Sequence, residues 1–131
     1  MKTITLTQPW ASAVALGVKR VETRSWSTNY RGQIAIHAAK GFPKYAKEFA
    51  SEVWQEGGNW IVGMPLGCVV AVAELVAILP TSGMTVDYLL NEEKKWGDYS
   101  QGRFAWFLEN VRALPEPIPA KGALGLWEWS R

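Results

Sequence analysis

Residues whose side chains could bind or transform a ligand are concentrated near the start of the sequence. Four basic side chains, one carboxylate and three aromatic rings lie between residues 8 and 32. In an ideal strand Glu22 and Arg24 share a face, so they could form an ion pair in which the carboxylate orients the guanidinium toward a ligand. By the same alternation Lys19 would point to the opposite face. However, it lies at the turn before the strand, where alternation does not reliably predict the direction of a side chain. The alternative is a solvated charged edge beside buried Trp10 and Trp26.

The elements expected to position this cluster are short strands and amphipathic helices. Alternating and β-branched residues predict strands at 2–7, 21–24, 33–38, 67–79, 104–114 and 124–129. Helical spacing and turn residues predict helices at 9–17, 43–56 and 85–96, the last with Thr85 as its cap. Residues 115–122 are expected to form an extended connector. The helices follow no regular βαβ alternation, so the pattern predicts an α+β fold or a helix-decorated β-barrel.

Composition limits the classes of partner. The chain has 131 residues, which predicts one domain over residues 1–131, and it contains eight tryptophans. An aromatic-rich core accommodates most of these rings, and base stacking is another use for the excess. The formal net charge is +2 and the isoelectric point is about 8.8. This charge permits an anionic partner but falls short of that expected for a protein that coats duplex DNA.

Cys68 and His37 are the only cysteine and the only histidine. An intramolecular disulfide and a cysteine-based zinc site are therefore excluded, and we expect neither a metal nor a cofactor. We expect His37 to be structural, and Cys68 to be a small core residue. The N-terminus has no apolar signal core and no apolar run reaches the length of a membrane span, so we expect no membrane association and a cytoplasmic location.

Several blocks of the sequence resemble a known family. Gln8-Pro9-Trp10-Ala11-Ser12, Gly17-x-Lys19-x-x-Glu22-x-Arg24-Ser25-Trp26 and Tyr30-Arg31-Gly32 are similar to the opening motif of ASCH (activating signal cointegrator homology) domains. Later blocks are also similar: the strand around Gly67-Cys68, residues 104–111, and Pro117-Ile118-Pro119-x-Lys121-Gly122 before Leu126-Trp127. The blocks keep the same order over nearly the whole chain.

The resemblance implies a PUA-like β-barrel of five to six strands decorated with two or three helices, with a cleft for RNA or single-stranded nucleic acid. In such domains the Gly-x-Lys-x-x-Glu-x-Arg segment lines the cleft, which places Lys19, Glu22 and Arg24 there. Lysine and arginine suit phosphate or carbonyl oxygens, and glutamate accepts from a base amino group. The remaining residues expected to bind are Gln8, Trp10, Ser12, Trp26, Tyr30, Arg31 and Lys121. Among these, Trp10, Trp26 and Tyr30 could stack on a base.

The resemblance also leaves an enzymatic alternative open, because some small ASCH proteins are amidohydrolases that act on the modified nucleoside N4-acetylcytidine. Lys19 matches their lysine base, but Glu22 stands at the position of their threonine nucleophile, and Thr23 is expected to face the other way. The same covalent mechanism is therefore not expected, whereas a Lys19–Glu22 pair that activates water is an alternative. Other family members resemble nucleases, so ribonuclease activity is a third possibility.

Residues outside the opening motif are weaker candidates for a functional site. Asp98, Tyr99 and Arg103 belong to a polar loop that either borders the cleft or is plain surface. Glu74 lies in a strongly apolar strand, so we expect it at a rim or paired with an arginine such as Arg24 or Arg103. The run from residue 92 to residue 95 is expected to be a solvated helix face.

Overall fold

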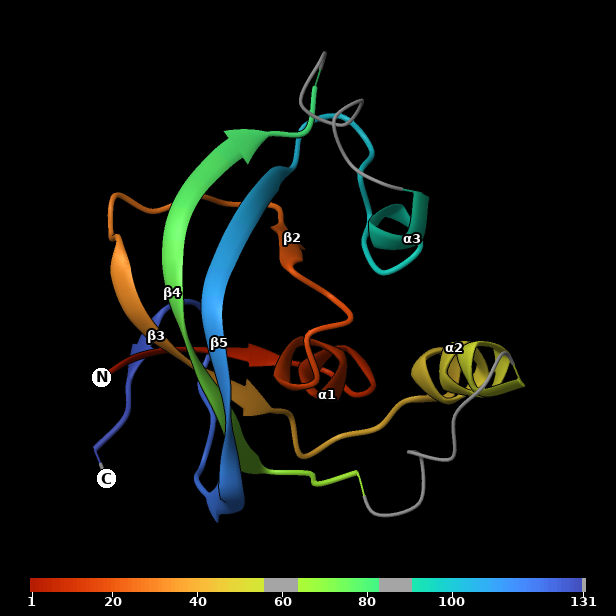
Figure 1. The fold of residues 1–131 in the computed structure, drawn as a ribbon, viewed down its shortest axis with the longest axis vertical. Helices are drawn as coiled ribbons and strands as arrows, with labels where there is room; N and C mark the ends of the chain where they lie inside the picture. Colours follow the sequence, from red (N-terminus) through yellow and green to blue (C-terminus); the bar gives the residue numbers. More distant parts are fainter. Residues whose placement is uncertain (56–63, 83–90, 131) are drawn as a thin grey trace.

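The computed structural model describes residues 1–55, 64–82 and 91–130, and these residues form six strands and three helices (Figure 1). In chain order the elements are β1 (Lys2–Leu6), α1 (Trp10–Ala15), β2 (Val21–Arg24), β3 (Gly32–Ala38), α2 (Lys44–Gln55), β4 (Cys68–Pro80), α3 (Asn91–Lys94), β5 (Phe104–Pro119) and β6 (Trp127–Glu128). The numbers of strands and helices agree with the prediction. Thr85, the expected cap of the third helix, lies outside the described residues.

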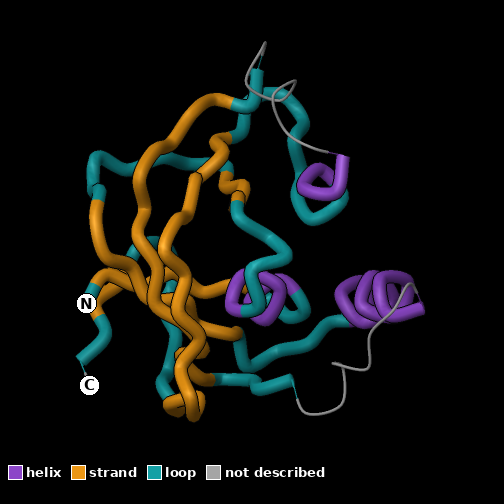
Figure 2. The backbone as a smooth tube through the Cα atoms, in the orientation of Figure 1, coloured by secondary structure: helices purple, strands orange, loops and turns teal. Residues whose placement is uncertain are grey.

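The strands, orange in Figure 2, form one mixed sheet. Their order is β2-β5-β4-β3-β1-β6. β1 and β3 pair in parallel, with Thr3 opposite Ala35, and the other neighbouring strands are antiparallel. All three helices lie to one side of the strands in Figure 1. This arrangement confirms the predicted α+β class.

The sheet is curved enough to bring its two ends near each other. β2 and β6 are its edges, and no backbone ladder joins them among the described residues, so the predicted closure into a barrel is not observed. However, Arg24 Nη2 on β2 donates a hydrogen bond of 2.7 Å to the carbonyl oxygen of Thr5 on β1. Register shifts along the β4–β5 ladder, and Asn110 with φ of 51°, increase the local twist that makes this approach possible. A side chain therefore bridges the two ends.

β5 is longer than predicted. The segment 115–119 was expected to be a connector, but it continues the strand, with Pro119 opposite Cys68 and Ile118 opposite Val69. Proline is tolerated here because β2 pairs only with residues 104–107, so the rest of β5 has one edge without a strand partner in the described part of the chain.

The core lies between α1 and the sheet. α1 presents Ala11 and Val14 to buried residues of the central strands, including Ile4, Ile36 and Trp106. The helix ends where Gly17 adopts a φ of 81°, which glycine tolerates because it has no Cβ. This short helix precedes β2 and thereby determines where the residues of the opening motif emerge from the core. None of the helices in the described ranges is long and apolar enough to cross a membrane.

Candidate functional site

Glu22 on β2 is the centre of a three-residue ionic cluster. Its Oε1 atom lies 3.2 Å from Lys19 Nζ, and its Oε2 atom lies 3.3 Å from Arg24 Nε. Each carboxylate oxygen thus faces a different cation, and Arg24 also donates a hydrogen bond to the carbonyl oxygen of Thr5. The structure therefore brings together the three residues that the opening motif singles out.

The members of this cluster differ in their access to solvent. Lys19 is fully buried, and its ammonium group also donates a hydrogen bond to the carbonyl oxygen of Val21. These two acceptors compensate for the loss of hydration of a buried charge. The side chain of Glu22 is 13% exposed and that of Arg24 is 23% exposed. Lys19 therefore positions Glu22 from the protein interior, while Glu22 and Arg24 are both partly open to solvent.

Glu22 and Arg24 line a pocket of about 460 Å³, a volume within the roughly 300–1,000 Å³ of small-molecule sites. The other lining residues come from β1 and the residues that follow it, from β2, from α1 and α2, and from the chain between α3 and β5: Thr5, Leu6, Thr7, Trp10, Thr23, Tyr45, Phe49, Lys95, Trp96, Gly97, Asp98 and Arg103. The pocket thus lies where the two ends of the curved sheet meet the helices.

Aromatic rings make up a large part of the pocket lining. Trp10 stacks on Phe49, with ring centroids 5.0 Å apart and an interplanar angle of 8°, and buried Trp96 meets Phe49 edge-on at 5.4 Å. One face of Trp10 is therefore covered by Phe49. Tyr45 is 62% exposed and lies 6.2 Å from Trp10, so it offers the most accessible ring of this group. Tyr45 was not predicted as a binding residue, because its spacing indicated only the apolar stripe of a helix.

The loop after α3 borders the pocket, as one of the two interpretations of the sequence predicted. Arg103 Nη2 donates to the carbonyl oxygen of Thr23 at 3.2 Å, and the Asp98 amide donates to Thr23 Oγ1 at 3.1 Å. Hydrogen bonds from Ser100 lower the pKa of Asp98, so this carboxyl group remains ionised. Asp98 and Arg103 thus add one charge of each sign to the pocket.

Tyr99 belongs to the same loop, and its side chain is partly buried. Burial raises the pKa of its phenol, and the nearby carboxylates of Glu93 and Glu22 raise it further. The hydroxyl group is buried and has no hydrogen-bond partner in the described part of the chain. Tyr99 therefore stays neutral at physiological pH, and its ring packs close to Gly97 on the pocket wall.

Gln8 and Ser12 were predicted to bind the ligand, but both are buried and neither lines the pocket. The Ser12 amide donates to Gln8 Oε1 at 2.9 Å, and Gln8 Nε2 donates to Ser12 Oγ at 2.8 Å and to the Pro65 carbonyl oxygen at 2.9 Å. Gln8 thereby satisfies polar groups at the start of α1 that would otherwise lack partners. In this structure the two residues hold the helix that carries Trp10.

Four other predicted residues lie outside the pocket. Trp26 packs edge-on against Trp106 at 4.9 Å, and the Tyr30 hydroxyl donates to the carbonyl oxygen of Gln33. Arg31 is exposed and donates to the carbonyl oxygens of Thr28 and Tyr30 at 2.8 Å, which closes the turn. Lys121 is exposed and lines a different cavity. The opening motif therefore combines pocket residues with residues that build the surrounding structure.

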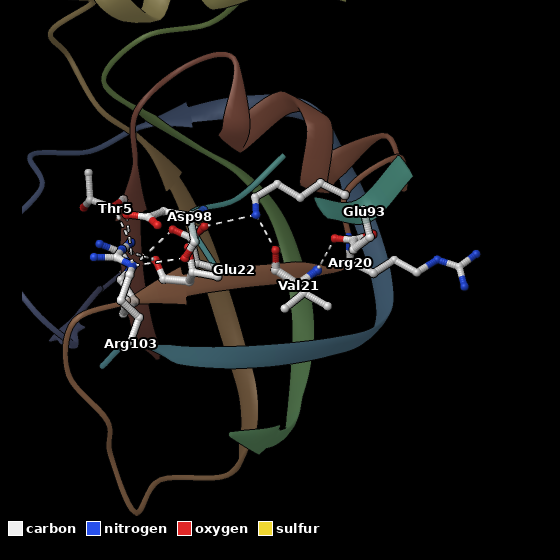
Figure 3. A network of polar contacts seen from close by, with 10 residues as sticks. Thr5, Arg20, Val21, Glu22, Glu93, Asp98 and Arg103 are labelled. Atoms are coloured by element: carbon white, nitrogen blue, oxygen red, sulfur yellow. Dashed lines mark hydrogen bonds and ion pairs between the residues drawn. The ribbon is translucent and has the colours of Figure 1, made fainter. Parts of the chain in front are cut away.

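Of two glutamates outside the opening motif, one differs from the prediction and the other takes one of its two expected positions. Glu93 on α3 was expected on a solvated helix face, but its carboxylate accepts hydrogen bonds of 2.9 Å from the Arg20 amide and 2.8 Å from the Val21 amide (Figure 3). It thereby ties α3 to the start of β2. Glu74 is exposed, in agreement with the first of its two expected positions, a rim, and its Oε1 atom lies 3.5 Å from Asn110 Nδ2. No cluster of three or more potential metal ligands occurs within the described residues.

The fold and the pocket together define an α+β domain with a polar and aromatic cleft. The model of the ASCH domain family matches residues 4–118, and because this is most of the sequence, the chain belongs to the ASCH domain family. Activating signal cointegrator 1 of Homo sapiens is 29% identical over 129 residues, which are 92% of this chain and 21% of that protein. The protein of the same name from Mus musculus is 26% identical and covers 95% of this chain and 22% of its own length. The chain thus spans about a fifth of the length of these curated relatives.

Solved structures of an ASCH protein from Zymomonas mobilis have a similar fold. A mutant of that protein, with phenylalanine in place of one tyrosine, superposes with a TM-score of 0.57 at 21% identity, covering 90% of this chain and 74% of that one. The unmutated protein gives a TM-score of 0.54 at 22% identity, covering 90% of this chain and 72% of its own. This likeness confirms the fold.

Proposed function

We propose that this domain binds single-stranded nucleic acid, with RNA as the first candidate, by taking one unpaired base into the pocket at Glu22 and Arg24. The observation that carries the proposal is the composition of the pocket. It combines a positioned carboxylate, a positioned guanidinium and an accessible aromatic ring within about 460 Å³. Membership of the ASCH family supports the same class of ligand, and the match over residues 4–118 supports treating residues 1–131 as one domain.

The chemistry of the two charged groups suits the edge of a nucleobase. Glu22 is an acceptor, and Lys19 and Arg24 hold its two oxygens in place, so it can accept from a base amino or imino group without first being ordered. Arg24 offers donors beside it for a carbonyl, ring nitrogen or phosphate oxygen. A base in an unpaired strand exposes these groups, whereas pairing in a duplex occupies them.

Tyr45 is the proposed stacking residue. Trp10 is half-buried against Phe49, while the ring of Tyr45 is exposed at the pocket. Stacking of one base contributes about 1–3 kcal/mol, which is about 5- to 150-fold in affinity. Trp10 and Phe49 then form the support behind that ring.

The enzymatic alternative is less well supported. A lysine base has to reach its substrate, but Lys19 is fully buried and its ammonium group is engaged by Val21 and Glu22. Lys19 is also absent from the pocket lining. Incubation of the protein with N4-acetylcytidine and with labelled RNA, followed by chromatography, tests this alternative. Turnover that disappears in Lys19→Met would replace binding with catalysis as the proposed function.

Fluorescence anisotropy with short labelled RNA and DNA strands at low salt tests the binding proposal. Tyr45→Ala and Arg24→Gln should each weaken binding by about 5- to 150-fold. The matched controls are Leu79→Ala, which truncates an exposed apolar side chain on β4, and Arg31→Gln, which removes an exposed arginine outside the pocket. Because Arg24 also bonds to Thr5, Arg24→Gln is checked for folding by circular dichroism, and Tyr45→Ala tests the pocket independently. Absence of binding, or binding that neither pocket variant weakens, would refute the proposal.

A further inference from the structure

A second, larger cavity adjoins the pocket. Its volume is about 940 Å³, and it lies between the ends of β1 and β3, the start of β4 and the chain that follows β5. Its lining consists of Thr5, His37, Ala39, Lys40, Leu66, Gly67, Pro119, Ala120, Lys121, Gly122, Ala123 and Leu124. Most of these side chains are small or aliphatic, and Leu124 is 98% exposed at the rim.

Hydrogen bonds within the protein hold the floor of this cavity rigidly. His37 is buried, and its Nε2 atom lies 2.7 Å from the carbonyl oxygen of Ala120, which can only accept, so Nε2 carries the proton. In the neutral ring Nδ1 then accepts from Thr5 Oγ1 at 3.1 Å, and that oxygen accepts from Trp127 Nε1 at 3.0 Å. All ring and indole polar atoms of this network are thereby used, so His37 shapes the floor and does not supply a group for a ligand.

The charges at this cavity have one sign. Lys40 and Lys121 are both exposed and both belong to the lining, and no carboxylate does among the described residues. The first pocket, in contrast, includes Glu22 and Asp98 as well as cations. The second cavity therefore suits a ligand that carries negative charge together with an apolar body.

Thr5 connects the two cavities, because it lines both of them. Its carbonyl oxygen holds Arg24 in the first pocket, and its side-chain oxygen belongs to the His37 network under the second cavity. A ligand that fills the first pocket and continues past Thr5 reaches the two lysines. A nucleic-acid strand has this form, since each base is followed by a phosphate and another nucleoside.

We infer that the second cavity is a subsite for the adjacent nucleotide of the bound strand. Its phosphate lies near Lys40 and Lys121, and its sugar and base cover the aliphatic lining around Leu66 and Leu124. This inference rests on the proposed function. It adds that the ligand is a strand of at least two nucleotides and that the two nucleotides are recognised differently. The base in the first pocket meets hydrogen-bonding groups, and its neighbour meets cations and aliphatic surface.

A length series of oligonucleotides tests the subsite. Titrations compare a nucleoside monophosphate with the di-, tri- and tetranucleotides of the same base, using wild type and the double variant Lys40→Ala/Lys121→Ala. We expect the dinucleotide to bind the wild type at least about tenfold more tightly than the monophosphate. The double variant should lose this gain and keep its affinity for the monophosphate. The slope of log affinity against log salt should fall by roughly 0.7, because the two lysines together neutralise one phosphate of a single strand.

The control is the double variant Arg31→Ala/Arg112→Ala, which removes two exposed cations that line neither cavity. The subsite is overturned if this control weakens dinucleotide binding as much as the lysine variant does, or if length brings no gain in the wild type. It is also overturned if Lys40→Ala/Lys121→Ala weakens the monophosphate and the dinucleotide equally. Failure of the proposed function gives a different result, namely no binding at any length or binding that Tyr45→Ala and Arg24→Gln do not weaken.

Discussion

Lys19→Met is the most informative single substitution, because it separates the structural contribution of Lys19 from a direct contact with ligand. Methionine keeps much of the aliphatic length of the side chain and removes the ammonium group. Glu22 then loses the cation 3.2 Å from its Oε1 atom and retains only Arg24, and the carbonyl oxygen of Val21 loses a donor. We therefore expect Lys19→Met to destabilise the fold.

The expected loss of stability follows from the burial of the Lys19–Glu22 ion pair. Removal of one partner from a buried ion pair costs about 3–5 kcal/mol. The cost should be lower here, about 2–3 kcal/mol, because Glu22 is 13% exposed and keeps Arg24 on its other oxygen. In a double-mutant cycle with Glu22→Gln, the double variant should be less destabilised than the sum of the single variants by about 1–2 kcal/mol.

Urea denaturation followed by tryptophan fluorescence measures these free energies of unfolding. The matched control is Arg20→Met, because Arg20 is the next residue in the chain and its side chain points away from the cluster (Figure 3). It should change stability by less than about 0.5 kcal/mol. If Lys19→Met changes stability as little as Arg20→Met, the Lys19 ammonium group is not held between Val21 and Glu22 and the reasoning is wrong.

Two other predictions concern the packing of the sheet. Gly122→Ala should destabilise the protein by about 1–3 kcal/mol, because a Cβ atom there would lie 2.7 Å from His37 Cε1 and 3.0 Å from Thr5 Oγ1. Gly41→Ala is its control, since a Cβ at residue 41 meets nothing within 4 Å; equal melting temperatures for the two variants would contradict the prediction. Burial raises the pKa of the Cys68 thiol, so less of it is thiolate at a given pH, and it should react with a thiol reagent at least about tenfold more slowly in the folded protein than in urea. Equal rates in the two conditions would show that Cys68 is accessible in the folded state.

Short-range patterns were sufficient for the number and approximate positions of the strands and for part of the ionic cluster. Alternation predicted that Glu22 and Arg24 share a face, and both line the pocket. Lys19 lies before β2, so the alternation of side chains along a strand does not fix the direction of its side chain. Its ammonium group contacts Glu22 from the protein interior. Its burial could not be predicted, because it depends on how α1 and β2 pack.

The residues whose positions were predicted wrongly from the sequence are those whose positions depend on tertiary packing. Trp26 and Trp10 are of the same type and belong to the same motif, yet Trp26 packs against Trp106 and Trp10 against Phe49 at the pocket. Tyr45 reaches the pocket from α2, a segment distant along the chain from the opening motif. Nothing in local spacing indicates such convergence. The proline-containing end of β5 was missed for a related reason, because whether a strand edge is free of partners is a property of the whole sheet.

The bond between Arg24 and the Thr5 carbonyl oxygen has a consequence for how this domain can diverge in evolution. The guanidinium joins the two ends of the sheet, and Arg24 also lines the pocket. A substitution at position 24 that alters ligand preference therefore also alters the connection between β2 and β1. Tyr45, which is exposed on α2, carries no such double constraint. Specificity should thus change more readily on the helical side of the pocket than on the strand side.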